Sequence, residues 1–372
     1  MRAWMEIDMD NLQYNIEKIK ELSGNSEIIC VVKANCYGMG AVEVVKEMVS
    51  HGINFFGIAS FEEGLELRQN NINAEMLVLG SLFDDEIEGS IKEGFHVSIN
   101  TIEQLEFIKE NKLDAKVHLK VDTGMGRIGF VEEDLESAYD YCQKNNIQVT
   151  GIYSHLSDAD IDTKDSYNYT INQINKFSKI EQMEKYKNVR HFHIFNSGAI
   201  VRYSDEIVGN AVRPGLCMYG MLGNERINGF KSVFAMKGRV IYKRTVHEKT
   251  PISYSRTASI EAGETFATIS VGYADGLKRE FSNNMYVLVH GEKCPIIGNI
   301  CMDMSIIKLP LSIYSKVKIG DEVTIYTDDI IKDIKCASTC SWEILTGIGR
   351  RVYRIYKKNG KNYKTVRWIS EN

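Results

Sequence analysis

The first 220 or so residues alternate short apolar runs with amphipathic stretches, and this alternation constrains the fold more than any other feature of the chain. Eight runs have the length of a strand, and the continuously apolar, β-branched ones are typical of strands buried on both faces of a parallel sheet. The expected strands span residues 28–33, 55–59, 76–80, 96–99, 117–122, 149–154, 191–196 and 211–213.

Apolar side chains between these strands recur with the spacing of one helix face. They are Val42, Val45 and Met48 in one segment, Ile102, Leu105 and Ile108 in another, and Ile171, Ile174, Phe177 and Ile180 in a third. Asn100 or Thr101 is expected to start one helix and Asp165 another. Eight strand-then-helix units in about 200 residues predict an α/β fold, a (β/α)8 TIM barrel. A doubly wound sheet would use fewer strands and a glycine-rich turn after the first, which this sequence lacks.

A different pattern begins after about Gly223. Short alternating strands separated by Gly and Asp turns, with one helix near 330–345, predict a mostly β second domain. The expected strands span 240–249, 265–271, 285–289, 293–300, 305–308, 322–326 and 363–369. We therefore divide the chain into a barrel over 1–225 and a C-terminal β-rich domain over 226–372. Whether the first few residues pair with the β-rich domain is left open.

Composition argues against several classes of protein. The net charge is −5 and no stripe of Lys or Arg is present, so neither nucleic acid nor a membrane surface is expected as a partner. No apolar stretch approaches the roughly 20 residues of a membrane-spanning helix, and the first residues do not resemble a signal peptide, which predicts a cytoplasmic protein. Cys336 and Cys340 come closest to a metal-binding pair but lack partners, so the eight cysteines are expected to be reduced thiols.

Chemically useful residues recur at the carboxyl ends of the expected strands, where the active residues of a (β/α)8 barrel lie. They are Lys33 and Tyr37, the segment 122–127 that ends in Arg127, His155, Asn196 with Ser197, and Arg213 before Pro214 and Gly215. A lysine that closes a buried strand is desolvated, which lowers its pKa and favours the neutral amine that attacks carbonyl groups. A single strand-end lysine usually only reaches solvent, but recurrence at five strand ends predicts a site.

Each of these residues also has an ordinary structural interpretation. The segment 122–127 could be only a glycine turn, His155 a satisfied core histidine, and Arg213 with Pro214 a strand stop. His191 and His193 share one strand face, yet the other strand ends lack the acidic and histidine partners of a barrel metal site. No metal is therefore expected.

Seven segments, in order and spread over essentially the whole chain, resemble the alanine racemase family. They are Trp4-Met-Glu-Ile-Asp8, Val32-Lys-Ala-Asn-Cys-Tyr-Gly38, Val121-Asp-Thr-Gly-Met-Gly-Arg-Ile-Gly129, Asn196-Ser197, Val212-Arg-Pro-Gly215, Gly272-Tyr-Ala-Asp-Gly276 and Ile300-Cys-Met-Asp303. The resemblance implies a barrel that binds pyridoxal 5′-phosphate (PLP), a β domain, and interconversion of L- and D-alanine, which supplies D-amino acid for cell-wall peptidoglycan.

The resemblance also implies two catalytic bases. Lys33 resembles the lysine that forms the Schiff base with PLP and acts on one face of the substrate. Tyr273 resembles the base for the opposite face, which in this family comes from the partner subunit of a homodimer. Two bases are needed because inverting a carbon requires removal of a proton from one face and delivery to the other.

Further roles follow from the same resemblance. His155 matches the histidine beside the cofactor, and Arg213 the arginine at the pyridine nitrogen. Arg127 resembles the arginine that engages the substrate carboxylate, and Lys120 matches its carbamylated lysine partner. The expected phosphate and cofactor contacts are Tyr37, Asn196, Ser197, the backbone N–H groups of Gly215 and Leu216, and Arg350, while Met302 and Asp303 are expected near the substrate carboxylate.

Two departures bear on the substrate. Asn299 stands where relatives commonly have an arginine at the entrance to the active site, and Arg350 stands where some have a tyrosine beside the phosphate. A serine racemase of the vancomycin-resistance type is the alternative, because binding separates methyl from hydroxymethyl by only about 1–3 kcal/mol. Those relatives normally carry an added membrane domain that this sequence lacks, which favours alanine.

Two rivals use the same cofactor. A non-catalytic PLP carrier resembles a lone barrel and lacks the β domain with Gly272-Tyr-Ala-Asp-Gly276. An amino-acid decarboxylase on a similar barrel uses an acidic partner at the pyridine nitrogen, and Arg213 argues against it.

Overall fold

The structure is a computed structural model that describes residues 1–223, 225–334 and 339–367. The chain forms two compact units, one of residues 13–218 and one that combines residues 1–12 with the chain from 219 onward. Within the described residues, no helix is both long and apolar enough to cross a membrane. Cys336 lies outside the described residues; the other seven cysteines are free thiols.

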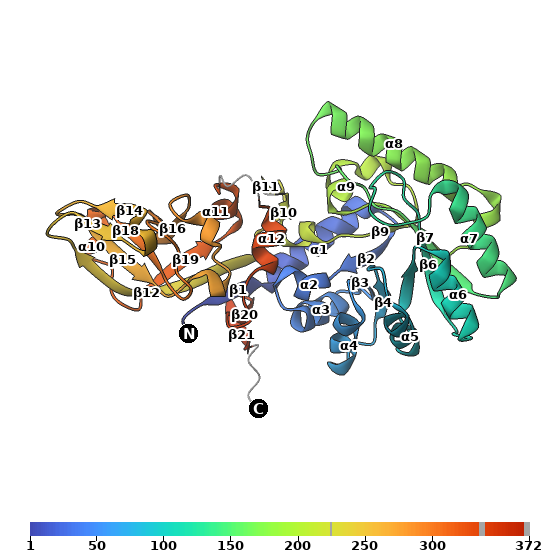
Figure 1. The fold of residues 1–372 in the computed structure, drawn as a ribbon, viewed down its shortest axis with the longest axis horizontal. Coiled ribbons are helices and arrows are strands. Elements are labelled where there is room, and N and C mark those ends of the chain that lie inside the picture. The colour runs from blue at the N-terminus through green and yellow to red at the C-terminus, as the bar shows by residue number, and fades with distance from the viewer. Residues whose placement is uncertain (224, 335–338, 368–372) are drawn as a thin grey trace. The chain divides into compact units, whose positions relative to one another are not determined.

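Eight parallel strands close into a barrel in the first unit (Figure 1). They are β2 (Glu27–Val31), β3 (Phe55–Ile58), β4 (Glu75–Val78), β5 (His96–Ile99), β6 (Lys116–Lys120), β7 (Gln148–Tyr153), β8 (His191–His193) and β9 (Ala211–Val212). The barrel closes where β9 pairs with β2 through Ala211 and Glu27. The predicted (β/α)8 barrel is therefore confirmed.

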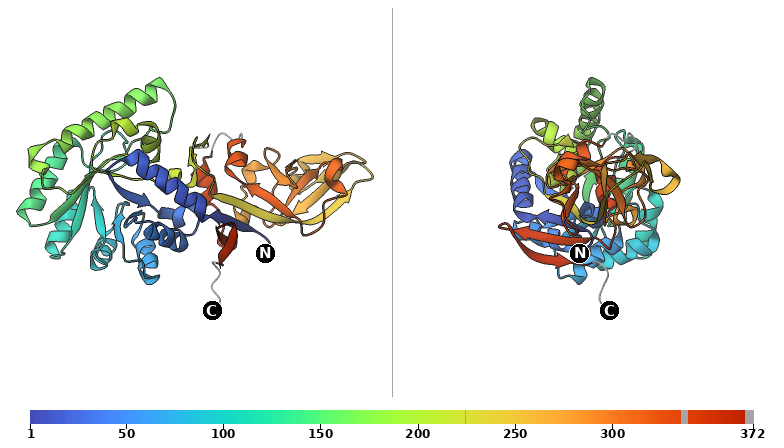
Figure 2. Two further views of the ribbon diagram at one scale, coloured as in Figure 1. Left: turned by 180° about the vertical axis from the view of Figure 1, so that it is seen from behind. Right: turned by 90° about the vertical axis from the view of Figure 1, so that its left-hand side faces the viewer.

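The helices of this unit start with one that precedes the first barrel strand, and the longer helices lie on the outside of the barrel (Figures 1 and 2). They are α1 (Met9–Ser23), α2 (Lys33–Tyr37), α3 (Ala41–Ser50), α4 (Phe61–Gln69), α5 (Asp84–Lys92), α6 (Ile102–Glu110), α7 (Glu132–Lys144), α8 (Lys164–Glu181) and α9 (Ser197–Arg202). Short 3-10 turns are η1 (Glu184–Tyr186), η2 (Ser204–Glu206) and η3 (Leu216–Tyr219). Ile29, Phe55, Leu77 and Ala211 pack together from four of the strands, so apolar side chains fill part of the barrel interior.

A nine-stranded sheet dominates the second unit, with the order β17-β16-β19-β12-β1-β20-β21; in addition β15 pairs with β12, and β18 pairs with β15. Its strands are β1 (Trp4–Asp8), β12 (Phe234–Thr245), β15 (Thr265–Ile269), β16 (Tyr286–Val289), β17 (Glu292–Pro295), β18 (Ser305–Leu309), β19 (Glu322–Tyr326), β20 (Tyr353–Lys358) and β21 (Lys361–Val366). Smaller elements are β10 (Met221–Leu222), β11 (Glu225–Arg226), β13 (Thr250–Ile252), β14 (Ala258–Ile260), α10 (Leu311–Tyr314), α11 (Asp328–Lys332), α12 (Ser341–Thr346), η4 (Tyr254–Arg256), η5 (Tyr273–Asp275) and η6 (Arg279–Phe281). The mostly β character of this unit is as predicted.

Strand β1, at the start of the chain, belongs to this second sheet. It pairs antiparallel with β12 and parallel with β20, which forms an adjacent hairpin with β21 (Figure 2). Glu6 in β1 accepts hydrogen bonds from Trp4 and Lys357 and lies 3.2 Å from the Lys237 amine. These interactions outweigh burial and lower the pKa of the Glu6 carboxyl.

Candidate active site

Lys33 lies just beyond β2, at the start of an unusual turn (α2). The expected strand through Lys33 is wrong by two residues, because β2 ends at Val31. Residues 34–37 all have φ between 51° and 55°, although none is glycine. Such left-handed backbone costs an L-residue about 1–2 kcal/mol and concentrates at functional sites. Glu63 tethers the turn, since one carboxylate oxygen accepts from the Ala34 N–H at 2.6 Å.

The Lys33 amine is half-buried and electrostatically shifted towards its neutral form. Burial is the largest cause of its lowered pKa, the positive charges of Arg127 and Arg213 add to it, and Glu63 opposes it. A lysine with these surroundings has more of the unprotonated amine that can act as nucleophile or base.

Arg213 is 3% exposed and surrounded by acceptors. Its Nη1 donates to the His193 carbonyl at 2.7 Å and to His193 Nδ1 at 2.6 Å, and its Nη2 donates to the Ser154 carbonyl at 2.6 Å. Burial lowers the pKa of Arg213 to about 10, so the guanidinium still carries its charge near neutral pH. The structure therefore holds a fixed cation at the carboxyl ends of the barrel strands.

His155 lies next to this cation. Its Nδ1 is 3.3 Å from Arg213 Nη2. Burial, followed by the charges of Arg213 and Arg127, holds the pKa of His155 well below its usual value, so the imidazole is neutral at physiological pH.

Lys120 and Arg127 flank the loop after β6. Lys120 is 2% exposed, its Nζ donates to the Val121 carbonyl at 2.8 Å, and burial with nearby Arg213 lowers its pKa to about 7. Asp122 accepts hydrogen bonds from three backbone N–H groups of the following turn, at 2.8–2.9 Å. That turn carries Arg127, whose side chain is exposed.

Tyr37, Ser197 and Gly215 converge from three strand ends. Ser197 Oγ accepts from the Gly215 N–H at 2.9 Å and from the Cys217 N–H at 3.3 Å. A Cβ atom at Gly215 would lie 2.5 Å from Tyr37 Oη, so only glycine leaves this approach open. Next to Ser197, Asn196 caps α9 by accepting from the Ala199 N–H at 3.1 Å. Leu216 begins η3 directly after Gly215.

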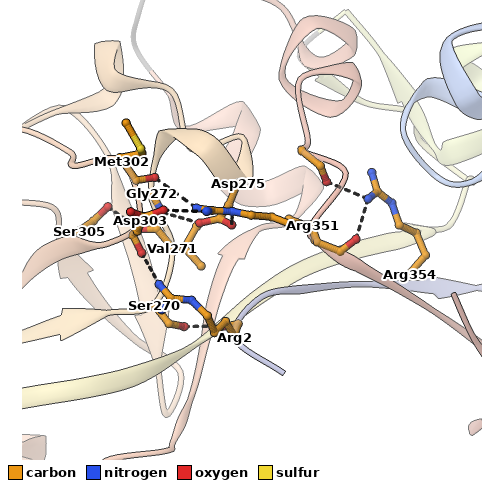
Figure 3. A network of polar contacts seen from close by, with 12 residues as sticks. Arg2, Ser270, Val271, Gly272, Asp275, Met302, Asp303, Ser305, Arg351 and Arg354 are labelled. Atoms are coloured by element: carbon orange, nitrogen blue, oxygen red, sulfur yellow. Dashed lines mark hydrogen bonds and ion pairs between the residues drawn. The ribbon is translucent and has the colours of Figure 1, made fainter. Parts of the chain in front are cut away.

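The remaining predicted site residues belong to the second unit, and the turn 272–276 that carries Tyr273 lies beside the loop of Met302 and Asp303. Figure 3 shows Gly272 and Asp275 of this turn next to Met302 and Asp303. The Tyr273 N–H donates to the Cys301 carbonyl and the Ala274 N–H to the Met302 carbonyl, each at 3.0 Å. The Tyr273 and Met302 residues are nevertheless 42% and 53% exposed.

Arg350 is exposed on the segment that leads into β20. Asn299 Nδ2 donates to the Tyr254 carbonyl at 2.8 Å. Both residues lie in the second unit, so the two groups of predicted site residues come from different compact units of the chain.

Comparisons with known proteins agree along the chain. Residues 7–223 match the family model for the alanine racemase N-terminal domain and residues 233–356 the model for its C-terminal domain. An alanine racemase of Fusobacterium nucleatum is 43% identical over 355 residues, which cover 95% of this chain and 99% of that protein. The solved alanine racemase of Clostridium difficile 630 has a TM-score of 0.90 at 31% identity and covers 100% of this chain and 99% of its own. The chain belongs to the alanine racemase family.

Membership of the alanine racemase family makes the protein an amino-acid racemase, an isomerase. An alanine racemase of Clostridium novyi is also similar, with 34% identity over 99% of this chain and 98% of that protein. The serine racemase alternative has no support from these relatives.

Several features of this racemase escaped the sequence analysis. The sequence suggests for His193 only the role of a metal ligand, whereas in the structure it is one of the acceptors that hold Arg213. His191 pairs with Glu27 at 3.0 Å. Within the described residues, no group of three or more His, Cys, Asp or Glu residues is arranged to hold a metal ion. The left-handed turn after Lys33 had no sequence signal, because Ala, Asn, Cys and Tyr are not residues that demand positive φ.

Proposed function

We propose that this protein is a PLP-dependent racemase that interconverts L- and D-alanine with Lys33 and the partner subunit's Tyr273 as its two bases. It works as a cytoplasmic homodimer and supplies D-alanine for peptidoglycan. The observation that carries the proposal is the Lys33 amine, which has a lowered pKa and lies at a barrel strand end in a chain of the alanine racemase family. The seven free thiols fit a reducing compartment.

The residues at the strand ends fit PLP. Lys33 offers an amine for the aldehyde, and Arg213 offers a buried donor for an unprotonated ring nitrogen. Tyr37 and Ser197 would hold the phosphate, and Gly215 leaves a space beside Tyr37 that a Cβ would fill. The Gly215 N–H donates to Ser197, so it would reach the phosphate only by exchanging this bond. Leu216 would add its N–H, Asn196 would support the loop by capping α9, and Arg350 would add a charge.

Bound PLP supplies an electron sink that acidifies the α-carbon of the amino acid. Arg213 would tune this chemistry, since a fixed cation beside the ring nitrogen would disfavour protonation of that nitrogen and moderate the sink. His155 stays neutral beside it and adds no second charge. A moderate electron sink would favour return of the proton to the α-carbon, which racemisation requires. It would disfavour transamination, the side reaction in which the proton is delivered to another atom.

Lys33 and the partner subunit's Tyr273 would exchange the α-proton on opposite faces of the substrate. In one chain these residues belong to separate compact units, and the Tyr273 residue is 42% exposed, which suits a group that serves a neighbouring copy. Met302 and Asp303 share its loop cluster and would approach the substrate carboxylate.

Arg127 would bind the substrate carboxylate, and Lys120 would fix Arg127 after carbamylation. The neutral amine would add to CO2 and lose one proton, which leaves an anionic carbamate where an ordinary lysine carries a positive charge. The pKa of about 7 at Lys120 makes that amine available. A carbamate would then hold the guanidinium through charge-assisted hydrogen bonds.

The test is racemisation of L-alanine and L-serine side by side, followed by circular dichroism and by deuterium uptake at the α-carbon in D2O. We expect inversion of alanine, at least about tenfold faster than serine, since a pocket for a methyl group discriminates against an added hydroxyl by 1–3 kcal/mol. Faster turnover of serine than of alanine would overturn the assignment of alanine as the substrate. A yellow protein that catalyses neither inversion nor exchange would overturn the proposed enzymatic function.

A further inference from the structure

Arg351 connects the turn 272–276 with the loop that carries Met302 and Asp303 (Figure 3). Its Nε donates to Asp275 Oδ1 at 2.6 Å, and its Nη1 lies 2.7 Å from Asp303 Oδ1. Its Nη2 donates to the Met302 carbonyl at 3.4 Å. One guanidinium thus contacts the turn 272–276 on one side and the loop 301–303 on the other, and all these residues lie in the same compact unit.

Asp275 transmits this contact to the backbone before Tyr273. The Asp275 residue is 2% exposed, and its Oδ2 accepts from the Gly272 N–H at 2.9 Å. A Cβ at Gly272 would lie 2.4 Å from the carbonyl oxygens of Cys301 and Met302, so the two loops approach as closely as backbone allows. A displacement of Asp275 would therefore move the turn as a whole.

Asp303 is held from a second direction. Arg2 Nη2 donates to the Asp303 carbonyl at 2.7 Å, and the Ser270 hydroxyl donates to the Arg2 carbonyl at 2.6 Å (Figure 3). The backbone around Tyr273 and Met302 is thus bonded from several sides, while their side chains remain exposed. A backbone fixed in this way holds the exposed Tyr273 and Met302 at defined positions, from which they can contact a substrate.

We propose that Arg351 is a positioning residue that sets the place of Tyr273 relative to Met302. The inference rests on the proposed function, in which Tyr273 is the second base. The planar fork of an arginine can bond two carboxylates at once, whereas the single ammonium of a lysine cannot reproduce that geometry. A lysine at 351 would keep the charge beside buried Asp275 and lose the bridge.

The test compares Arg351→Lys with Arg226→Lys. Arg226 Nε lies 3.4 Å from Asp328, another buried aspartate of the same unit, so the control makes the same chemical change at a similar pair. Each holoenzyme is given D-alanine or L-alanine alone in D2O, and α-proton exchange is followed by NMR. Tyr273→Phe identifies the enantiomer whose exchange depends on Tyr273. Amide hydrogen exchange over 271–276 is measured in the protein without substrate.

Arg351→Lys is expected to slow exchange from the Tyr273-dependent enantiomer about tenfold or more relative to the other, because a displacement of about 1 Å can cost a hundredfold. It should also speed amide exchange at Tyr273 and Ala274, and Arg226→Lys should do neither. Equal loss from both enantiomers, no loss, or unchanged amide exchange would overturn the inference. If Arg351→Lys does not fold, Asp275→Asn with Arg351→Gln removes both charges together and serves instead.

The proposed function and this inference fail in different ways. If Tyr273→Phe affects both enantiomers equally, the two-base assignment is wrong. In that case amide exchange over 271–276 still decides whether Arg351 holds the turn.

Discussion

Arg213 Nη1 donates a hydrogen bond of 2.6 Å to His193 Nδ1. Because a guanidinium can only donate, Nδ1 of His193 is the unprotonated nitrogen and Nε2 carries the proton. That Nε2 lies 2.9 Å from His118 Nδ1, and His118 Nε2 lies 3.2 Å from His96 Nδ1. His193 Nε2 therefore donates to His118 Nδ1, and His118 Nε2 donates to His96 Nδ1. The proton position on all three buried imidazoles follows from the hydrogen bond with Arg213.

All three histidines are expected to be neutral and protonated at Nε2. Burial is the main cause that lowers the pKa of each, to about 3 for His96 and well below the usual value for His118 and His193. NMR of protein with 15N-labelled histidine should show three Nε2–H imidazoles that do not titrate between pH 8 and about 5, whereas the same residues in urea titrate near 6.5. An imidazolium at His96, His118 or His193 at pH 6 would contradict this arrangement.

The free energy of unfolding should fall as the pH drops below about 6.5. The folded pKa values of His96, His118, His155 and His193 are all lowered, so below that pH the unfolded chain binds more protons than the folded one. Each histidine can contribute up to about 1.4 kcal/mol per pH unit. Urea unfolding at pH 7.5, 6 and 5 measures the slope, and His96→Asn should reduce it. A stability that does not change over this range would contradict the prediction.

The barrel was predictable because its signal is local and repeated. Each strand is an apolar run of its own, and β5 spans the same residues, His96–Ile99, that the sequence predicted. The carboxyl ends of the other barrel strands were placed too late, as at Asn196, because apolar sequence continues after β8 ends at His193.

Helix starts were harder to predict where two polar residues compete. Thr101 caps α6 as expected, whereas α8 is capped by Thr163, whose Oγ1 accepts from the Ser166 N–H at 3.2 Å, and not by Asp165. Asp165 lies in the first turn of α8 and Thr163 lies just before the helix. Both residue types are common N-caps, so only the backbone geometry decides between them.

The second sheet depends on distant pairings. The sequence alone leaves open whether the first residues join this sheet, because the partners of β1, in β12 and β20, lie more than 200 residues away. The strands β10, β11, β13, β14 and β20 were not predicted, and the one helix expected over 330–345 is instead two short helices, α11 and α12. Residues 335–338 of that expected helix, and 368 and 369 of the strand expected over 363–369, lie outside the described residues.

The candidate site was predictable in its side chains and not in its backbone. Lys33, His155 and Arg213 were found because residues of useful chemistry stand at successive strand ends. The acceptors that hold Arg213 include the Ser154 and His193 carbonyls, which every residue possesses and no sequence pattern marks. In the second unit the sequence pointed to Arg350, whereas its neighbour Arg351 makes the contacts with Asp275 and Asp303.

Lys33→Ala should abolish both racemisation and the visible absorption band of the bound cofactor. The change removes the one amine that has a lowered pKa in the left-handed turn. Lys176→Ala is the matched control, since Lys176 is exposed on α8. Absorption spectra with a racemisation assay measure both effects. A normal band in Lys33→Ala would remove Lys33 from its proposed role.

Lys120 should form a carbamate that depends on pH. Its pKa of about 7 leaves a large share of neutral amine at pH 7.5, whereas an ordinary lysine is nearly all ammonium. With 13C-labelled bicarbonate, an NMR signal of a protein carbamate should be present at pH 8 and weaken as the pH falls below about 7. Lys120→Arg should lack it. A signal that persists in Lys120→Arg would assign the carbamate elsewhere.

Gly215→Ala should weaken PLP binding. The new Cβ would lie 2.5 Å from Tyr37 Oη, so the phenol must move, and Tyr37 sits on the strained left-handed turn beside Lys33. Overpacking of this kind costs about 1–3 kcal/mol, and a loss of 1.4 kcal/mol in binding raises the Kd for PLP about tenfold. Titration of the apoenzyme with PLP measures this Kd.

Gly89→Ala is the control for Gly215→Ala, because its Cβ would meet the Phe61 ring at 3.0–3.3 Å, away from the predicted cofactor residues. It should leave the Kd for PLP unchanged. In a Tyr37→Phe background the clashing oxygen is gone, so Gly215→Ala should then cost less than it does in the native chain. Equal costs in the two backgrounds would mean that Tyr37 is not the group that the glycine makes room for.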